Sequence, residues 1–399
     1  MRVLSNRGQE MPSSPIRRLV PFADKAVADG KHVYYLNIGQ PDIKTPETFL
    51  NPIKTMDMPV VAYGPSAGLM SLRKKFAEYY KRFDINVEAN DILITTGGSE
   101  AIIFTLMAIT DIGDEIIIPE PFYTNYNGFA VEAGIKVVPI QSSIENDFQL
   151  PPIESIREKI TAKTRAIMIC NPNNPTGYVY SEKEMNALRD IVLEHDLFLL
   201  TDEVYREFVY DGEKHVSAMH LKGIEDRVIM LDSVSKRYSA CGARIGMIVS
   251  KNHQVIESAL KFGMARLCPP TIEQIGCEAA VDTPDSYFKE VIDEYLERRN
   301  TMVSLLRNIP GVVCPMPKGA FYLVVRLPVD DADKFAQWLL TDFNIKNETL
   351  LIAPANGFYS SPGLGKDEVR IAYVLNVNDI KKAIHILAEG LKVYPGRVS

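Results

Sequence analysis

One lysine of this chain stands between two apolar runs. Lys236 follows the run 228–231 after two serines, and a second apolar run occupies residues 245–249. A buried lysine without an anionic partner either loses its proton or is costly to desolvate. A neutral amine is what imine formation with an aldehyde requires. The segment therefore predicts an amine biased toward neutrality, unless Lys236 is an ordinary surface lysine in a loop.

Glycines and a serine follow another apolar run, at residues 92–95. The sequence Gly97-Gly98-Ser99-Glu100 opens a predicted helix. Free N–H groups and the dipole at a helix N-terminus favour a phosphate, and glycines allow it to approach closely. The Glu100 side chain must then point away from that phosphate. The pattern alone does not identify a phosphate site, because glycine turns before helices are common.

A ring and a polar loop follow two further runs. Residues 119–123 read PEPFY, and their prolines present Tyr123, which either stacks on a flat ligand or joins the core. Residues 171–177 read NPNNPTG. Two X-Pro bonds and three asparagines, Asn174 among them, predict a rigid loop that presents polar side chains. Such a loop has more polar and conformationally restricted residues than a simple connection between two elements needs.

The remaining polar residues lie after the next two runs. Asp202 and Tyr205 follow the run 197–201, where a carboxylate needs a cation or a protonated nitrogen to offset its desolvation. Ser233, Ser235 and, eight positions beyond Lys236, an arginine follow the run 228–231. In a parallel sheet, ligands bind beyond the carboxyl ends of the strands. A planar aldehyde with a phosphate and a ring nitrogen, pyridoxal 5′-phosphate, matches the whole set.

The elements that must position these residues alternate between strands and helices. Seven runs are predicted as strands, several of them apolar throughout: 92–95, 115–118, 136–140, 165–170, 197–201, 228–231 and 243–249. Helical patterns lie between many of them, for example 99–110 and 182–195. The alternation predicts an α/β fold with a large domain, whose mostly parallel seven-stranded sheet is flanked by helices.

The pattern changes after a long charged helix predicted at 285–308. Strand and helix patterns then follow at 321–327, 332–343, 369–374 and 377–393. They predict a smaller α+β domain, formed by the C-terminal part and an N-terminal arm that is irregular over residues 1–14. The predicted division is 1–40 for the arm and part of the small domain, 41–284 for the large cofactor-binding domain and 285–399 for the small domain.

The motifs, taken in order, resemble those of the class I/II aminotransferases, which have the aspartate aminotransferase fold (fold type I). They are Tyr63-Gly64-Pro65, GGSEA, PEPFY, NPNNPTG, DEVY, SVSK with Arg244 eight positions beyond its lysine, and a late EVRIAY. The resemblance covers nearly the whole chain. It implies a pyridoxal-phosphate-dependent aminotransferase that moves an amino group between an L-amino acid and a 2-oxo acid such as 2-oxoglutarate, by a ping-pong mechanism.

By motif position, the resemblance also implies roles at the cofactor ring. Lys236 forms an imine with the cofactor and later moves the proton of the substrate α-carbon. Asp202 keeps the pyridine nitrogen protonated. Tyr205 and Asn174 hydrogen-bond the phenolic oxygen, and Tyr123 stacks on the ring. The resemblance thus makes Lys236, Asp202 and Tyr205 the catalytic residues.

Phosphate and carboxylate contacts are implied in the same way. The residues implied at the phosphate are Gly98, Ser99, Glu100 through its backbone, Ser233, Ser235 and Arg244. Tyr63 resembles a tyrosine that reaches the phosphate of the neighbouring subunit, which implies a homodimer with shared active sites. Arg370 lies in an apolar strand and needs an anion. The resemblance makes that anion the substrate α-carboxylate, held between two guanidinium N–H groups near Gly39 and Asn174.

Composition excludes several other classes of protein. A net charge of −7 provides no basic surface for nucleic acid or an anionic membrane. No apolar run reaches membrane-spanning length, and the N-terminus has no apolar stretch of the signal-peptide kind, so we expect a cytoplasmic protein. The five cysteines are scattered without the spacing of metal ligands. We expect reduced packing cysteines and no metal site.

The sequence leaves the substrate open. One aspartate-preferring branch of the family has a lysine after the two glycines, where this chain has Ser99. Arg17, Arg18 and Arg266 are either replacement cations for a side-chain carboxylate or solvated surface arginines. Aspartate, aromatic amino acids, alanine and methionine all remain possible donors, with glutamate and 2-oxoglutarate as the default second pair.

Two alternatives to an aminotransferase need to be weighed. One keeps the cofactor and the fold but changes the reaction, to a C–S lyase or another β-eliminating enzyme. The other is a non-enzymatic, cofactor-binding regulator. Such a regulator usually carries a DNA-binding segment, and the sequence before Ser14 is short and contains no basic helix.

Overall fold

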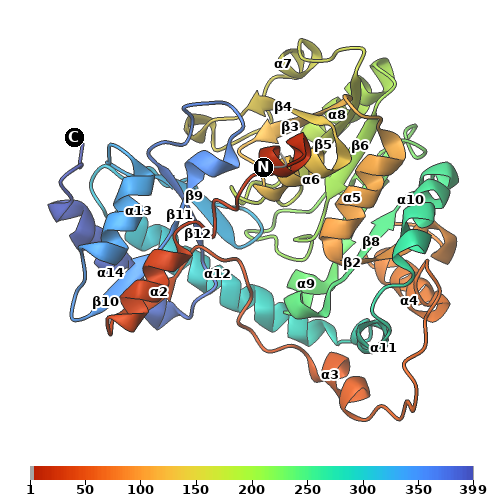
Figure 1. Ribbon diagram of the computed structural model, residues 1–399, viewed down its shortest axis with the longest axis horizontal. Helices are drawn as coiled ribbons and strands as arrows, with labels where there is room; N and C mark the ends of the chain where they lie inside the picture. Colours follow the sequence, from red (N-terminus) through yellow and green to blue (C-terminus); the bar gives the residue numbers. More distant parts are fainter. Residues whose placement is uncertain (1–3, 399) are drawn as a thin grey trace.

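A seven-stranded sheet forms the framework of one half of the molecule in the computed structural model, which describes residues 4–398 (Figure 1). In spatial order its strands are β2 (Ile92–Thr96), β8 (Ile245–Val249), β7 (Val228–Ser233), β6 (Phe198–Asp202), β5 (Thr164–Cys170), β3 (Glu115–Glu120) and β4 (Lys136–Gln141). Neighbouring strands are parallel, except that β8 is antiparallel to both β2 and β7. The predicted mostly parallel seven-stranded sheet is confirmed.

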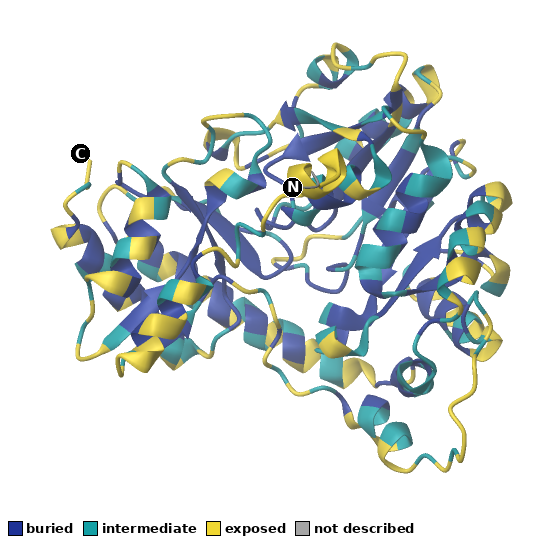
Figure 2. Ribbon diagram, viewed as in Figure 1, coloured by how far each residue is buried: buried dark blue, intermediate teal, exposed yellow. Residues whose placement is uncertain are grey.

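Helices cover both faces of this sheet, which explains why its strands are apolar throughout. One face packs against α5 (Gly97–Ile109), α6 (Asn125–Ala133) and α10 (His253–Arg266). The opposite face packs against α4 (Met70–Lys81), α8 (Glu182–Glu194) and α11 (Thr271–Ala280). Figure 2 shows the strands buried and the outer sides of the helices exposed. The carboxyl ends of the parallel strands are therefore held in a rigid frame.

Both ends of the chain build the other half. β9 (Tyr322–Arg326), β12 (Glu368–Ala372) and β11 (Ala353–Pro354) form an antiparallel sheet, and β1 (His32–Tyr35) pairs in parallel with β10 (Glu348–Leu351). Strands β1, β9, β10 and β12 share one apolar cluster with α2 (Val20–Ala28), α12 (Asp285–Arg307), α13 (Ala332–Thr341) and α14 (Val377–Val393). In Figure 1, α2 from the N-terminal end lies beside α13 from the C-terminal end. A smaller α+β part built from both ends is thus confirmed.

Several short elements were not predicted. They are α1 (Asn6–Glu10), α3 (Glu47–Lys54), α7 (Ile153–Arg157), α9 (Val234–Arg237) and strands β10 and β11. The prediction of an irregular arm is wrong for residues 6–10, which form α1. The Ser5 hydroxyl caps this helix by accepting a hydrogen bond from the Gly8 N–H at 3.2 Å. Residues 1–3 of that prediction lie outside the described residues. In the part of the chain that is described, no helix has the length and apolar character needed to cross a membrane.

One close approach fixes how α5 begins beside the sheet. A Cβ atom on Gly246 in β8 would lie 2.3 Å from the Gly97 carbonyl carbon and 2.5 Å from the Gly98 nitrogen. Any side chain at position 246 must therefore push the first turn of α5 away from the sheet. A Cβ atom on Gly242, in contrast, would have no other described atom within 4 Å.

We predict that Gly246→Ala lowers the free energy of unfolding by about 1–3 kcal/mol, the usual cost of overpacking a tight contact. Gly242→Ala is the matched control, and it should change the free energy of unfolding by less than about 0.5 kcal/mol. Urea unfolding followed by circular dichroism measures both. Equal stability of the two variants would contradict the close approach of β8 to α5.

Candidate active site

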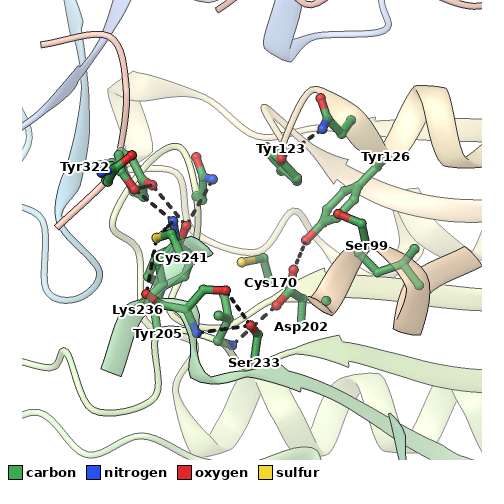
Figure 3. Close-up of a pocket in the computed structure, with 18 of the residues that line it drawn as sticks. Ser99, Tyr123, Tyr126, Cys170, Asp202, Tyr205, Ser233, Lys236, Cys241 and Tyr322 are labelled. Atoms are coloured by element: carbon green, nitrogen blue, oxygen red, sulfur yellow. Dashed lines mark hydrogen bonds between the residues drawn. The ribbon is translucent and has the colours of Figure 1, made fainter. Parts of the chain in front are cut away.

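A cavity of about 320 Å³ lies beyond the carboxyl ends of the parallel strands, between the two halves of the molecule. This volume is in the range of small-molecule sites. Most of the site residues predicted from the sequence line it: Gly39, Gly98, Ser99, Tyr123, Asn174, Asp202, Tyr205, Ser233, Ser235, Lys236, Arg244 and Arg370. Figure 3 shows Lys236, Tyr205 and Tyr322 on one side of the cavity and Ser99 and Tyr126 on the opposite side.

Lys236 extends from α9 into the cavity and is half-buried. Its Nζ donates a hydrogen bond to the Gly39 carbonyl at 2.8 Å and approaches the Cys241 sulfur at 3.6 Å. Burial lowers the pKa of Lys236, but the neighbouring Tyr322, Cys241 and Tyr123 groups outweigh burial, so its pKa is raised above the ordinary value. The predicted bias toward a neutral amine is therefore wrong for the chain alone, because these neighbours favour the ammonium form.

Buried ion pairs hold α9 in place. Arg237, next to Lys236, donates to both oxygens of the Asp232 carboxylate at 2.6 and 2.5 Å. Arg206 donates to the same carboxylate at 3.1 Å and to Glu203 at 3.0 Å. These two arginines outweigh the effect of burial and lower the pKa of Asp232. The ion pairs therefore tie the turn that carries Lys236 to the loop that follows β6.

Asp202 ends β6 and meets the cavity without a cation from the described chain. The Tyr126 hydroxyl donates to its Oδ2 at 2.8 Å, and the Val204 N–H donates to its Oδ1 at 3.3 Å (Figure 3). Burial raises the pKa of Asp202 to about 6, although the Tyr126 hydrogen bond opposes this rise. A cationic partner inside the cavity would lower that pKa again. The carboxyl group is therefore suited to a positively charged nitrogen of a ligand.

Hydrogen-bond donors gather beside the lysine (Figure 3). The Tyr205 and Tyr322 hydroxyl oxygens lie 3.0 Å apart, and Asn174 Nδ2 donates to the Tyr205 hydroxyl at 3.4 Å. Burial, the largest cause, raises the pKa of Tyr205 well above its ordinary value, so its phenol stays protonated. Tyr205 and Asn174 can thus donate together to one ligand oxygen. The predicted pairing of these two residues agrees with this geometry.

Arg244 closes the side of the cavity next to the start of α5. A Cβ atom on Gly97, whose φ is +75°, would lie 2.1 Å from Arg244 Nη2, so the guanidinium lies directly over the helix N-terminus. The Ser233 and Ser235 hydroxyl oxygens are 2.7 Å apart, and both residues line the same cavity. A helix N-terminus, two hydroxyl groups and a guanidinium are the donors that a phosphate needs.

Arg370 lies in β12 and is 2% exposed. Its Nη1 donates to Asn174 Oδ1 at 3.2 Å and its Nη2 donates to the Asn37 carbonyl, while Nε has no partner in the described chain. The Tyr322 ring lies 4.6 Å from the guanidinium carbon. Burial lowers the pKa of Arg370. A buried guanidinium that has no carboxylate partner within residues 4–398 and lines a cavity is a site for a ligand anion.

Two predicted site residues lie outside the cavity lining. Tyr63 is 82% exposed, on the segment between α3 and α4 that Figure 2 shows as mostly exposed. The Glu100 side chain turns back to accept from the Thr96 N–H at 2.7 Å and from Arg266 Nε at 3.1 Å. The Glu100 side chain is therefore bound at the N-cap of α5 and does not line the cavity, in agreement with the expectation that it avoids a phosphate there. Arg266 is partnered by Glu100 and is not a free cation for a substrate, which corrects one of the three arginine candidates.

Four lining or supporting residues were missed. Tyr126 follows Tyr123 by three positions, a helical spacing that could have drawn attention to it. Tyr322 is the second residue of the predicted strand 321–327, and nothing in the sequence marks it. Asn37 is a lone amide in the apolar run 33–38, which was a usable signal. Cys241, predicted as a packing residue, lines the cavity beside Lys236.

Comparison with known proteins agrees with this geometry. The family model described as aminotransferase class I and II matches residues 31–387. The chain belongs to this family. It is 33% identical to the aspartate aminotransferase of Bacillus subtilis over 96% of this chain and 97% of that protein. It is 31% identical to aromatic-amino-acid aminotransferase 2 of Thermococcus litoralis over 98% of each chain.

Solved structures of aminotransferases have the same fold. The alanine aminotransferase of Pyrococcus furiosus superposes with a TM-score of 0.88 at 30% identity, over 98% of this chain and 100% of that one. The protein is thus an aminotransferase, an enzyme that moves an amino group between an amino acid and a 2-oxo acid. The C–S lyase alternative is not favoured by these relatives. The family as a whole depends on pyridoxal phosphate.

The raised pKa of Asp202 leads to a pH-dependent stability. Its pKa is about 6 in the folded chain against an ordinary value of 3.8, so the folded state holds the proton more tightly. The resulting stabilisation is full below about pH 4 and is lost as the pH rises toward 6. Asp202→Asn removes this loss, because an amide does not ionise.

We predict a pH-dependent difference in the free energy of unfolding between Asp202→Asn and the parent, both freed of small molecules. Between about pH 4 and pH 7.5 this difference should shift in favour of the variant by about 2 kcal/mol. Denaturant unfolding at several pH values measures this difference. Asp226→Asn, at an exposed position, serves as the control and should show a flat difference. A flat difference for Asp202→Asn would mean that Asp202 titrates normally.

Proposed function

We propose that the cavity binds pyridoxal 5′-phosphate and that the enzyme uses it to move an amino group between L-amino acids and 2-oxo acids. One observation carries the proposal. Lys236, Arg244 and Arg370 line one cavity, and none of them has an acidic partner among residues 4–398. Each matches a ligand group. An aldehyde can form an imine with the amine, and a phosphate and a carboxylate can pair with the two guanidinium groups.

The residues present fit the cofactor at three separate places. Arg244 over the N-terminus of α5, with Ser99, Ser233 and Ser235 nearby, offers donors to the phosphate. The Asp202 carboxylate would accept a hydrogen bond from the protonated ring nitrogen, and that positive partner would lower the pKa that burial raises. The Glu100 backbone belongs to the same helix start, and its side chain is directed elsewhere. We assign the ring face to Tyr123, whose hydroxyl is held by Asn125 at 2.9 Å.

When bound, the cofactor supplies a ring that takes up the electron pair released at the substrate α-carbon. The Lys236 amine is the base that removes the α-proton and later returns it, since no other lysine of residues 4–398 lines the cavity. Asp202 keeps the proton on the ring nitrogen, which makes the ring a better acceptor. Tyr205 and Asn174 donate to the phenolic oxygen and fix its orientation.

Arg370 orients the substrate. Its Nε has no partner in the described chain, and its Nη2, which donates to the Asn37 carbonyl, has a second N–H, so these two groups can hold the α-carboxylate. Gly39 brings its backbone close to the same place, because a Cβ there would lie 1.7 Å from the Tyr322 hydroxyl. Its carbonyl also accepts from Lys236 Nζ at 2.8 Å. The α-carbon of a bound amino acid would therefore be held beside the base.

Assembly, location and domain division complete the proposal. Exposed Val60, Val61 and Tyr63 form an apolar segment of the kind that subunit contacts bury, and we propose a homodimer in which Tyr63 reaches the partner's phosphate.

We propose a cytoplasmic enzyme without membrane or nucleic-acid partners. We also propose a large domain over 41–284 and a small one from 1–40 and 285–399, which is consistent with the separate apolar clusters of the two halves.

The test of this function is the visible absorption spectrum with pyridoxal phosphate bound. Adding a single amino acid without a 2-oxo acid should shift the absorption to the shorter wavelength of the pyridoxamine form, which establishes the first half of a ping-pong reaction. Lys236→Ala should slow this conversion by about a thousandfold or more, the scale of a lost general base. Lys251→Ala, at an exposed position, is the control. Failure of every donor despite bound cofactor would refute the proposal.

Arg370 offers a second test. Arg370→Lys keeps the positive charge but loses the two-pronged contact, so we predict that KM for both amino and 2-oxo acids rises about 10- to 100-fold. Steady-state kinetics with the donor and the acceptor varied in turn measures this rise. Arg165→Lys, at a surface ion pair, is the control. Unchanged KM values would place the carboxylate contact elsewhere.

A further inference from the structure

A fourth cation, Arg17, lines the same cavity. It lies on the irregular segment between α1 and α2, and its side chain is exposed. Among the described residues it forms no ion pair, whereas Arg18 pairs with Asp333 and Arg266 pairs with Glu100. Of the three arginines considered from the sequence as substrate cations, only Arg17 is both on the cavity and free of an acidic partner.

Contacts immediately before Arg17 fix its backbone. The Ile16 carbonyl accepts from Asn37 Nδ2 at 3.0 Å, and Ile16 packs on the apolar cluster that contains Phe358. Pro15 lies against Gly357, where a Cβ would come within 2.3 Å of the proline Cβ. Because the segment is anchored immediately before position 17, the Arg17 side chain starts from a defined place at the cavity wall.

The same anchor connects Arg17 to Arg370. Asn37 is fully buried; its side chain holds the Ile16 carbonyl, and its own carbonyl accepts from Arg370 Nη2. Phe358 packs with Ile16 and also lies 4.9 Å from the Arg370 guanidinium carbon. The two arginines are thus tied by one residue. The backbone that carries Arg17 is therefore fixed relative to Arg370, and both arginines line the same cavity.

We propose that Arg17 is the specificity-determining residue for the substrate side chain, and that it binds a second carboxylate. This inference rests on the proposed function. Lys236, Arg244 and Arg370 are matched there to an aldehyde, a phosphate and the α-carboxylate, so Arg17 is the one lining cation of the described chain without a ligand group. A guanidinium pairs best with a carboxylate. The substrate class is therefore the dicarboxylic amino and 2-oxo acids, such as aspartate, glutamate and 2-oxoglutarate.

The test compares Arg17→Met with Arg17→Lys and with Lys25→Met, which removes one charge from the exposed side of α2. In the holoenzyme, the ratio of kcat/KM for aspartate or glutamate to that for alanine or phenylalanine should fall about 10- to 100-fold in Arg17→Met. Arg17→Lys should retain an intermediate ratio, because the charge remains. Lys25→Met should keep the parent ratio.

A binding measurement separates recognition from turnover. By calorimetry, the Kd of succinate for the holoenzyme should rise about 10- to 100-fold in Arg17→Met, and the Kd of butyrate, which has one carboxylate, should rise far less. An unchanged donor ratio together with an unchanged succinate Kd would overturn the inference. A selective loss of activity toward phenylalanine would also overturn it, because it would indicate that Arg17 stacks on an aromatic ring. Failure of the parent enzyme with every donor would instead refute the proposed function.

Discussion

The active site depends on a set of ion pairs buried beneath it. Asp232, Arg206 and Arg237 are each 1% exposed, and Glu203 is fully buried. Leaving any one of these charges without its partner costs about 3–5 kcal/mol, far more than an exposed pair contributes. The ion pairs therefore permit only one arrangement of the turn after β7 and the loop after β6. Lys236 stands on that turn, and Tyr205 stands on that loop.

The rigid sheet and ion pairs beneath the cavity allow incompletely paired charged groups to line it. Within the described chain, Asp202 is a carboxyl group without a cation, and Arg370 is a buried guanidinium without a carboxylate. Both are unfavourable without a ligand, since each is buried and incompletely paired. The surrounding sheet and ion pairs hold them there. Ligand groups of complementary charge therefore bind more favourably here than they would to a site whose charged groups were already paired with one another.

Sequence patterns predicted the frame and most of the cavity lining, because strand ends in a parallel sheet converge at one edge. They were less useful where the outcome depends on three-dimensional neighbours. The raised pKa of Lys236 comes from Tyr322, which reaches it from β9, and from Cys241, five positions further along the chain. Tyr322 itself lies far from Tyr205 along the chain but shares a hydrogen bond with it. Very short strands such as β11 carry too few residues to show a period.

The charge of the cavity is opposite to that of the whole chain. The net charge is −7, yet Arg17, Lys236, Arg244 and Arg370 all line the cavity. Of the carboxylates there, Asp232 is paired with buried arginines and Asp202 has a raised pKa. A cationic hollow on an acidic protein concentrates anions at one place. Phosphate, an α-carboxylate and a side-chain carboxylate together would neutralise the three arginines of the cavity, with which no acidic side chain of residues 4–398 pairs.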